Sequence, residues 1–413
     1  MQILFFMKII RDPIHGYIEV EDFVLQIIST EIFQRLRHIT QTGLAYLVYP
    51  GMRHTRFEHS LGVMHLAKEL TRYIKINSEQ YTDLDFINEE YLKLVGLSGL
   101  LHDIGHLPFS HTFENALSLA KEVYGIDVEY YGKKTHVIFG NRVIDYYLGN
   151  YLDKLSKNYD VVNFVQRVIS STPRTKEESL ASLIISSPLD ADRGDYLLRD
   201  SYFAGVGYGN FDIERIKRSL IYVNGKLAVL KKAIPVVEQF LLARMYMYET
   251  IYFHSVVGLY NAVLSHAVVK LIQKNLIPNV APENYLKLND VVIMSKLNEA
   301  GREFFDAIVY RKGFKRYKKD LTGNCYETLE KKRKEINEIM RENNGLILYH
   351  DFYDVPYSED EIFVYDDDEL KPLSTESKIV SSLTIIKKGI VGYHESAEDK
   401  MKKIYEILQE CPL

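Results

Sequence analysis

The sequence of 413 residues contains no tryptophan and only two cysteines, Cys325 and Cys411. Two cysteines make no disulfide framework and no zinc finger, and they fit a reducing cytoplasm. No segment approaches the roughly 18 uninterrupted apolar residues of a membrane span, and the apolar N-terminus lacks the basic leader and cleavage site of a signal peptide. We therefore expect a cytoplasmic protein without a membrane partner, and a buried first strand that begins near Met7.

A strong excess of one charge is also absent. The formal net charge is −5, so the chain as a whole is not built to coat nucleic acid. Hydrophobic residues make up 46% and charged residues 26%, the mix of an ordinary globular protein. Basic runs at Arg311–Lys319 and Lys331–Lys334 are the exceptions, and we interpret them as solvated helix faces. A functional role for them would be an allosteric nucleotide or nucleic-acid contact.

Apolar residues recur at helical spacing through most of the first 275 residues, from Asp22 onward. Turn signals between β-prone residues predict a hairpin over Ile9–Val20. Asn224-Gly225 predicts a second hairpin, between Leu220–Val223 and Lys226–Leu230. Helical patterns fit residues 57–75, 88–103, 137–155, 159–171, 179–187, 190–202, 212–220 and 234–273. These elements predict a mainly α-helical bundle with minor β hairpins.

The pattern changes after Pro278. Residues 290–345 still look helical, and an acidic run at Asp366–Glu369 separates two predicted strands, Glu361–Tyr365 and Ser381–Lys388. An amphipathic helix over Ala397–Gln409 follows. We therefore place a boundary near residue 275, between a catalytic domain of residues 1–275 and a C-terminal α+β region of residues 276–413 with an oligomerisation or regulatory role.

The doublet His102-Asp103 ends an apolar helical pattern. Neighbours in a helix lie about 100° apart, so both side chains reach one point only above the crest between them. A metal ion satisfies that geometry with one imidazole nitrogen and one carboxylate oxygen. Ionisable groups among Leu and Ile also need a partner, because burying them unpaired costs several kcal/mol. The alternative is a helix end that carries polar residues by chance.

Two further segments add candidate groups. The first supplies His59 and the positive charge of Arg56. The second runs from Asp190 to Asp200, and its three- and four-residue spacings place Asp192 and Asp200 on one broad helix face. Taken alone, this second segment is also typical of an exposed, charged helix. We interpret three other histidines as surface or packing residues: His38, His54 and His65.

Together the three segments resemble the HD-domain phosphohydrolases, whose ligand order is a His, a His-Asp doublet and an Asp. The flanking strings resemble the deoxynucleotide triphosphohydrolase branch of that superfamily. They are Arg-Phe-Glu-His-Ser-Leu-Gly-Val at 56–63, Leu-His-Asp-Ile-Gly-His-Leu-Pro-Phe-Ser-His at 101–111 and Asp-Arg-Gly-Asp-Tyr-Leu-Leu-Arg-Asp at 192–200. Asp-Pro-Ile-His-Gly at 12–16 and Gln-Arg-Leu-Arg-His-Ile-Thr-Gln at 34–41 also resemble it. The resemblance covers about residues 8–270.

The resemblance implies an HD-domain helical bundle that holds one divalent metal ion. The implied ligands are His59, His102, Asp103 and Asp192. This nitrogen and oxygen set suits Fe, Mn, Ni, Co, Zn or Mg. The implied substrate-binding residues are Gln41, Arg56, Arg193, Tyr196 and Asp200, and the implied catalytic residues are His106, His111, Glu114 and His136. We assign His111 as the general acid or base, because imidazole titrates near working pH.

Three positions depart from the family's pattern without touching the metal set. Glu114 stands where the family usually has an Asp that orients the catalytic His, so the relay is one methylene longer. Val137 follows His136 where the family has a Glu, so the orientation of His136 can differ. Arg193 stands where the family has a Lys, and its guanidinium offers a bidentate fork to phosphate.

The expected function is hydrolysis of a nucleotide, with a (deoxy)nucleoside triphosphate as the substrate. A nucleotidase or a phosphodiesterase acting on another nucleotide is the alternative enzyme, because it would share the metal site. A non-catalytic sensor of nucleotides or nucleic acid is the alternative outside the enzymes, and the basic region of residues 311–334 is its only support. The resemblance also implies a homo-oligomer, a dimer or a higher assembly.

Overall fold

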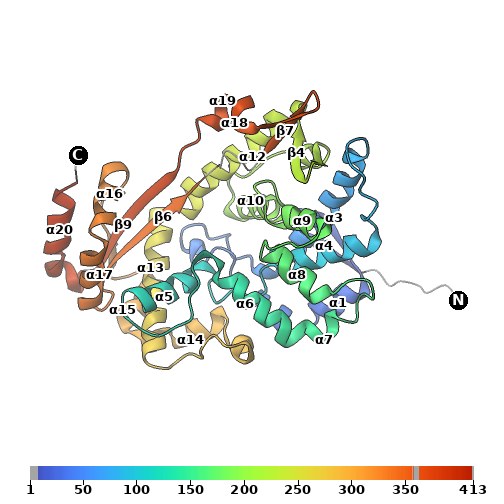
Figure 1. Ribbon diagram of the computed structural model, residues 1–413. Helices are drawn as coiled ribbons and strands as arrows, with labels where there is room; N and C mark the ends of the chain where they lie inside the picture. Colours follow the sequence, from blue (N-terminus) through green and yellow to red (C-terminus); the bar gives the residue numbers. More distant parts are fainter. Residues whose placement is uncertain (1–7, 356, 358–361, 412–413) are drawn as a thin grey trace.

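Three crossing helices form the part of the molecule that positions the site. The computed structural model describes residues 8–355, 357 and 362–411 (Figure 1). Within it, α3 (Arg56–Ser78) packs against both α4 (Glu89–Leu101) and α10 (Ala191–Ala204). A capping box formed by Thr55 and Glu58 starts α3. The predicted mainly helical class is confirmed.

Smaller helices surround these three. They are α1 (Asp22–Ile28), α2 (Glu31–Gln34), α5 (His111–Glu122), α6 (Thr135–Val143), α7 (Gly149–Leu152), α8 (Val161–Ile169), α9 (Lys176–Ile185) and α11 (Ile213–Lys217). The sequence pattern predicts no helix at α5, although this helix carries two of the implied catalytic residues. The single helix predicted over 137–155 is interrupted by a π turn at Ile144–Leu148.

The N-terminal hairpin forms as predicted but lies at the surface. β1 (Lys8–Asp12) pairs antiparallel with β2 (Gly16–Val20). The expectation of a buried first strand is wrong for the described part of that strand, since Ile9 is 62% exposed. β2 supplies the buried face of the hairpin instead, through Ile18 and Val20. Met7 lies outside the described residues.

The single helix predicted over 234–273 is two helices. α12 (Ile234–Met247) passes into a π turn at Tyr248–Tyr252, and α13 (Ser255–Gln273) starts afresh after a break at Phe253. The ring of His254 accepts the amide of Val256 at 3.3 Å and caps the new helix. Hydrophobic periodicity alone does not reveal such a break, because both helices keep an apolar face. α13 is long and apolar enough to cross a membrane, but 78% of that window is buried inside the protein.

The C-terminal region is α+β, as predicted. β6 (Ile347–Asp354) and β9 (Ile386–His394) run side by side along α13, and β5 (Phe314–Arg316) completes their sheet (Figure 1). The helices of this region are α14 (Asp290–Ala300), α15 (Arg302–Tyr310), α16 (Gly323–Lys331), α17 (Arg333–Glu342), α18 (Leu373–Glu376), α19 (Lys378–Ser381) and α20 (Lys402–Gln409). The predicted strand over 381–388 is therefore displaced towards the C-terminus, and β6 has no counterpart in the prediction.

A second sheet joins strands from both sides of residue 275. β3 (Leu220–Val223) and β4 (Lys226–Leu230) form the predicted hairpin, with φ of 51° at Asn224 and 74° at Gly225. β4 then pairs in parallel with β7 (Phe363–Asp366), which pairs with β8 (Glu369–Pro372). The acidic run is thus the turn of a hairpin. The domain boundary near residue 275 stays a prediction.

Two further expectations need correction. Cys325 and Cys411 form a disulfide across 86 residues, although two cysteines gave no reason to expect a bond. They meet because α20 folds back against α16, a contact that their sequence separation does not reveal. The basic run Arg311–Lys319 is no helix face, since α15 ends before it with Arg311 at a φ of 55° and β5 follows.

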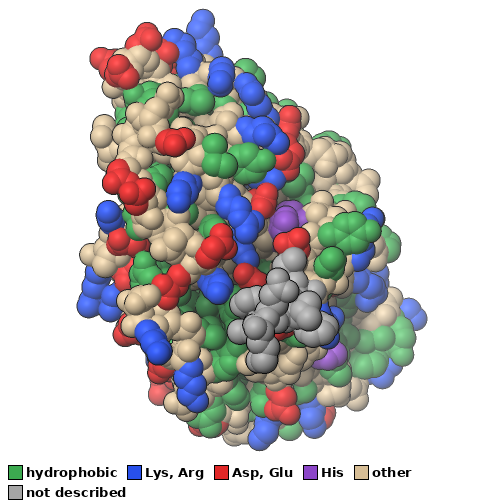
Figure 2. Space-filling view, turned by 90° about the vertical axis from the view of Figure 1, so that its right-hand side faces the viewer, with side chains coloured by type: hydrophobic (Ala, Val, Ile, Leu, Met, Phe, Trp, Pro, Cys, Tyr) green, Lys and Arg blue, Asp and Glu red, His purple; other side chains and the backbone are tan. Residues whose placement is uncertain are grey.

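Charges of both signs are mixed on one face of the protein. On the face shown in Figure 2, basic and acidic side chains are interspersed, with hydrophobic side chains in small groups between them. The basic run is partly neutralised as well, because Arg316 pairs with Asp320 at 2.6 Å and Lys315 pairs with Glu398 at 3.5 Å. This region therefore presents less free positive charge than its sequence suggests.

Candidate metal centre and histidine cluster

The four predicted metal ligands meet where α3, α4 and α10 cross. His59 lies in the first turns of α3, His102 and Asp103 follow α4 directly, and Asp192 lies at the start of α10. The Oδ1 atom of Asp192 is 3.1 Å from His59 Nε2 and 3.6 Å from His102 Nε2. The carboxylate of Asp103 lies 3.3 Å from His102 Nε2 and 3.5 Å from His59 Nε2.

The two imidazoles are oriented with one nitrogen free. His59 Nδ1 bonds to Asp195 Oδ2 at 2.8 Å, and His102 Nδ1 bonds to the carbonyl of Gly99 at 2.8 Å. Both Nε2 atoms are buried without a hydrogen-bond partner among the described residues. A histidine that donates through one nitrogen and offers the other is typical of a metal ligand. The donor set and the unpartnered atoms therefore fit a divalent cation.

Carboxylates dominate the electrostatics around the two imidazoles. Burial lowers the pKa of His59, but the neighbouring carboxylates of Asp192 and Asp195 outweigh burial and raise that pKa to about 10. Burial opposes ionisation of Asp192, yet the two histidines hold its pKa below the usual range. Carboxylates thus surround the two imidazoles, and a bound divalent cation would balance their charge.

A buried network behind His59 was not foreseen from the sequence. Asp195 accepts from His59, from His15 Nε2 at 2.7 Å and from the guanidinium of Arg199 at 2.8 Å. Arg199 also reaches Asp12 at 2.8 Å, which ties the N-terminal hairpin to the site. A side chain at Gly62 would overlap the carboxylate of Asp195, so this close approach needs glycine. The four-residue spacing of Asp195 and Arg199 was the available signal.

Arg56 is engaged within the protein rather than free. Its Nη1 donates to Asp103 Oδ2 at 2.5 Å and its Nε donates to Ser110 Oγ at 2.9 Å. A third contact, at 3.3 Å, reaches the carbonyl of Gln41. The guanidinium therefore orients a predicted ligand and the segment before α5, in addition to the phosphate-binding role that the sequence predicts for it.

Asp200 is held on both oxygens. His54 Nε2 lies 2.6 Å from Oδ1, and the hydroxyl of Tyr252 donates to Oδ2 at 2.6 Å. The interpretation of His54 as a packing histidine agrees with its burial, but its partner is a predicted substrate-binding residue. Arg193 is likewise paired, with Asp190 and with the carbonyl of Ser187.

A cavity of about 640 Å³ unites most of the predicted residues. The predicted residues that line it are Gln41, Arg56, Asp103, His106, His111, Glu114, His136, Asp192, Arg193, Tyr196 and Asp200. His59 and His102 lie behind this wall and are buried. Another part of the wall is aromatic and comes from the break after α12 and from β6, through Tyr248, Tyr252, Phe253 and Phe352. The cavity thus combines charged and imidazole groups with flat apolar surfaces.

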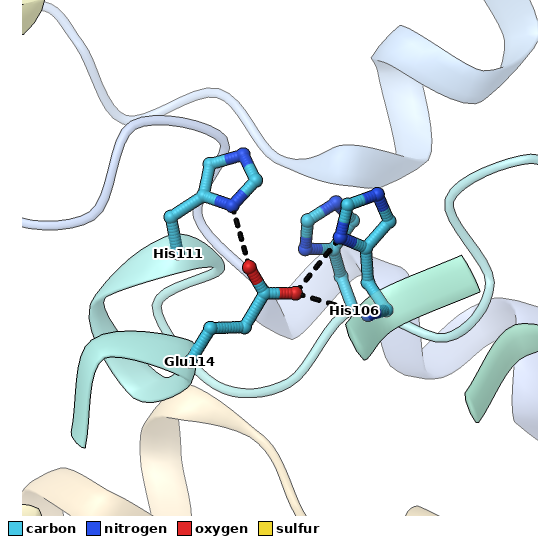
Figure 3. Close-up of side chains that lie close together, drawn as sticks. His106, His111 and Glu114 are labelled. Carbon is cyan, nitrogen blue, oxygen red and sulfur yellow. Dashed lines mark hydrogen bonds and ion pairs between the residues drawn. The ribbon is translucent and has the colours of Figure 1, made fainter. Parts of the chain in front are cut away.

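A second cluster lies beside the metal ligands, around one carboxylate (Figure 3). Glu114 Oε2 lies 2.8 Å from His111 Nδ1, and Glu114 Oε1 lies 2.8 Å from His136 Nδ1. Oε1 also accepts the amide of His136 at 3.1 Å. The ring of His106 stacks on that of His136, with centroids 4.3 Å apart, and its Nε2 lies 3.3 Å from Asp103. His106, His111 and His136 with Glu114 could themselves hold a metal ion.

The turn that joins the two clusters is conformationally strained. Phe109 has a φ of 56° and Ser110 a φ of 55°, in the left-handed region that non-glycine residues avoid at a cost on the order of 1–3 kcal/mol each. Ser110 is the residue before α5, so this conformation sets where His111 points. Strain of this kind persists only where surrounding contacts hold it.

The comparisons with known proteins agree with this geometry. Residues 56–193 match the HD domain, and residues 211–391 match the HD associated region. An uncharacterized protein of Methanocaldococcus jannaschii is 34% identical over 91% of this chain and 76% of its own length. A crystal structure of a hypothetical protein from Aquifex aeolicus superposes with a TM-score of 0.76 at 32% identity, covering 96% of this chain and 99% of that one.

The chain belongs to the HD-domain superfamily of metal-dependent phosphohydrolases. It is also similar to that superfamily's deoxynucleoside triphosphate triphosphohydrolases. SAMHD1 of Bos taurus is 35% identical over 51% of this chain, and the SAMHD1 homolog of Dictyostelium discoideum is 33% identical over 60%. The matched parts span only 37% and 46% of those two proteins.

The HD-family departures at 114 and 137 compensate each other. The longer side chain of Glu114 reaches both His111 and His136, so one carboxylate serves two histidines although Val137 offers none. Burial raises the pKa of Glu114, but the two histidines outweigh burial and hold it well below its usual range. The orientation of His136, in doubt from the sequence, is thus fixed by Glu114.

Asp192→Ala should remove most of the bound divalent metal and abolish hydrolysis, because it deletes a carboxylate oxygen that lies within 3.6 Å of both imidazole Nε2 atoms. His111→Ala is the matched variant, which should retain the metal while hydrolysis slows by about 10²-fold or more. Metal analysis of the purified proteins beside a phosphate-release assay measures both. Retention of metal and rate by Asp192→Ala would show the ligand assignment to be wrong.

Asp195→Asn should weaken metal binding by about 10- to 100-fold, because the amide removes the charge that orients and polarises His59. Calorimetric titration of the metal-free protein with Mn²⁺ measures the affinity. Asp153→Asn, at an exposed position, is the control and should bind Mn²⁺ as the parent does. Equal affinities for Asp195→Asn and the parent would contradict an orienting role.

Glu114→Gln should lower the midpoint of thermal unfolding at pH 7. Because the folded pKa of Glu114 lies below its unfolded value of about 4.3, its carboxylate stabilises the fold above that pH, and the contribution is lost as pH falls through the folded pKa. The difference from the parent should therefore shrink in melts below about pH 4. Glu122→Gln, at the exposed end of α5, should show no such pH-dependent difference.

Proposed function

We propose that this protein hydrolyses a phosphoester or phosphoanhydride of a nucleotide, with a (deoxy)nucleoside triphosphate as the substrate. The observation that supports this most is the composition of the cavity. It places Asp103 and Asp192 of the metal centre beside the histidine cluster, and the aromatic wall of Tyr248 and Phe352 belongs to the same cavity. Hydrolysis of a phosphate needs the metal centre and the histidine cluster, and a nucleobase or sugar packs well against the aromatic wall.

His59, His102, Asp103 and Asp192 would hold the divalent ion in this proposal. When bound, such an ion supplies Lewis acidity towards a phosphoryl oxygen and lowers the pKa of a water molecule. Four protein ligands leave positions for substrate and solvent on a six-coordinate ion. Metal analysis of the purified protein identifies the ion among Fe, Mn, Ni, Co, Zn and Mg.

The residues of the chain divide the remaining work. His111 is 65% exposed at its side chain while its Nδ1 is fixed by Glu114, so its Nε2 is available to donate a proton to a leaving oxygen. Arg193 and Tyr196 line the same cavity and would bind phosphate oxygens. Asp200, fixed by His54 and Tyr252, would accept a sugar hydroxyl, and Gln41 would contact the sugar or base.

The activity of two similar proteins also supports this choice of substrate. Both SAMHD1 proteins are described as deoxynucleoside triphosphate triphosphohydrolases, and they match 60% and 51% of this chain. A homo-oligomer and a cytoplasmic location remain predictions beside this proposal. The disulfide between Cys325 and Cys411 makes the compartment a separate question.

A panel of nucleotides incubated with the Mn²⁺-loaded protein tests the function. We expect turnover of (deoxy)nucleoside triphosphates with release of triphosphate or phosphate, and no turnover by Asp192→Ala. Product analysis by anion-exchange chromatography distinguishes triphosphate from phosphate. Turnover confined to monophosphates or cyclic nucleotides would favour the alternative enzymes, and tight binding without turnover would favour a sensor.

A further inference from the structure

A carboxylate outside the HD domain accepts a hydrogen bond from the strained turn before His111. The Oδ1 atom of Asp290 accepts the amide of Phe109 at 2.6 Å, and its Oδ2 atom accepts the amide of Thr40 at 2.8 Å. Asp290 is the first residue of α14, within the region matched by the HD associated model. It therefore joins two segments that lie 181 and 250 residues away in the sequence.

Neighbouring groups hydrogen-bond to the backbone of Gly105 and His106. Arg35 donates through Nε to the carbonyl of Leu288 and through Nη2 to the carbonyl of His106, both at 2.7 Å. The hydroxyl of Tyr285 donates to the carbonyl of Gly105 at 3.2 Å. The adjacent carbonyls of Gly105 and His106 are thus bonded to Tyr285 and to Arg35, and Arg35 is itself bonded to Leu288. Tyr285, Leu288 and Asp290 therefore bond, directly or through Arg35, to backbone groups between Gly105 and Phe109.

The two hydrogen bonds from the amides of Thr40 and Phe109 require a carboxylate at residue 290. Asp290 is buried and makes no ion pair among the described residues, so its two oxygens are satisfied by backbone amides. An amide side chain of the same shape would offer one acceptor and would point a second donor at a backbone donor. Burial raises the pKa of Asp290 to about 6, which agrees with an uncompensated carboxylate at this position.

We propose that Asp290 is a positioning residue, which holds the Phe109–Ser110 turn in its left-handed conformation and so places His106 and His111 for catalysis. This inference rests on the proposed function for its catalytic consequence. It gives the HD associated region a part in the chemistry, because the residue that fixes the turn comes from there. Asp290 is not among the residues that line the cavity and bonds to none of the predicted metal ligands; it reaches the cavity wall only through the backbone amide of Phe109, so it acts through the turn.

Asp290→Asn in the Mn²⁺-loaded, full-length protein is the test. We expect kcat to fall by about 10- to 100-fold, with KM nearly unchanged and metal content equal to the parent's, because a catalytic group displaced by about 1 Å costs about 10²-fold. Amide exchange measured by mass spectrometry should speed up in peptides that cover residues 38–42 and 106–113. Asp290→Glu keeps the charge but lengthens the side chain, and it should show the same loss.

Asn289→Ala is the matched control on the same helix. Asn289 caps α14 by accepting the amide of Val292 at 3.1 Å, so its loss destabilises the start of the helix without removing the carboxylate. We expect its kcat and the exchange of residues 106–113 to match the parent's. Unchanged kcat and exchange in Asp290→Asn would overturn the inference, as would an equal loss of kcat in Asn289→Ala.

The two proposals can fail separately. If the parent turns over no nucleotide, the proposed function fails, and the exchange of residues 106–113 alone decides whether Asp290 holds the turn. If the parent is active and Asp290→Asn loses its metal along with its rate, the residue supports the metal centre instead, and the inference is wrong.

Discussion

The site depends on carboxylates that are gathered around two buried imidazoles. Asp103 and Asp192 face the free nitrogens of two imidazoles, and Asp195 stands behind one of them. An isolated buried carboxylate is costly, so such a group persists only where a cation or several donors satisfy it. Arg56 pairs with Asp103 and Arg199 pairs with Asp195, so these two arginines balance part of the negative charge. The remaining carboxylate and imidazole atoms could hold a metal ion.

Much of this centre could be predicted because its residues lie in contiguous strings. His59, His102, Asp103 and Asp192 each sit on or beside a helix with recognisable periodicity, and the structure brings all four together. Contacts between distant segments could not be predicted in that way. His15 reaches Asp195 across 180 residues, and this pairing depends on where the hairpin packs, which no local pattern encodes.

The errors in the predicted fold have the same origin. The break at Phe253 between α12 and α13 interrupts an apolar pattern that continues on both sides, so periodicity predicts one helix. α5 was missed because it is short and its first turn holds the polar residues His111 and Glu114, although Phe113, Leu117 and Ala120 recur at helical spacing. Local propensity is overridden where tertiary contacts hold a segment in place.

The C-terminal region completes the site rather than merely adjoining it. β6 supplies Phe352 to the cavity wall, and Arg244 of α12 fixes the end of that strand through a buried pair with Asp354 at 2.7 Å. A side chain at Gly258 on α13 would collide with the ring of Phe352, so the strand sits as close to the helix as backbone allows. The region matched by the HD domain therefore contributes most of the charged and imidazole groups of the cavity, while residues beyond 240 contribute most of its aromatic wall. A change at Phe352 or Gly258 would accordingly reshape that wall without altering any of the predicted metal ligands.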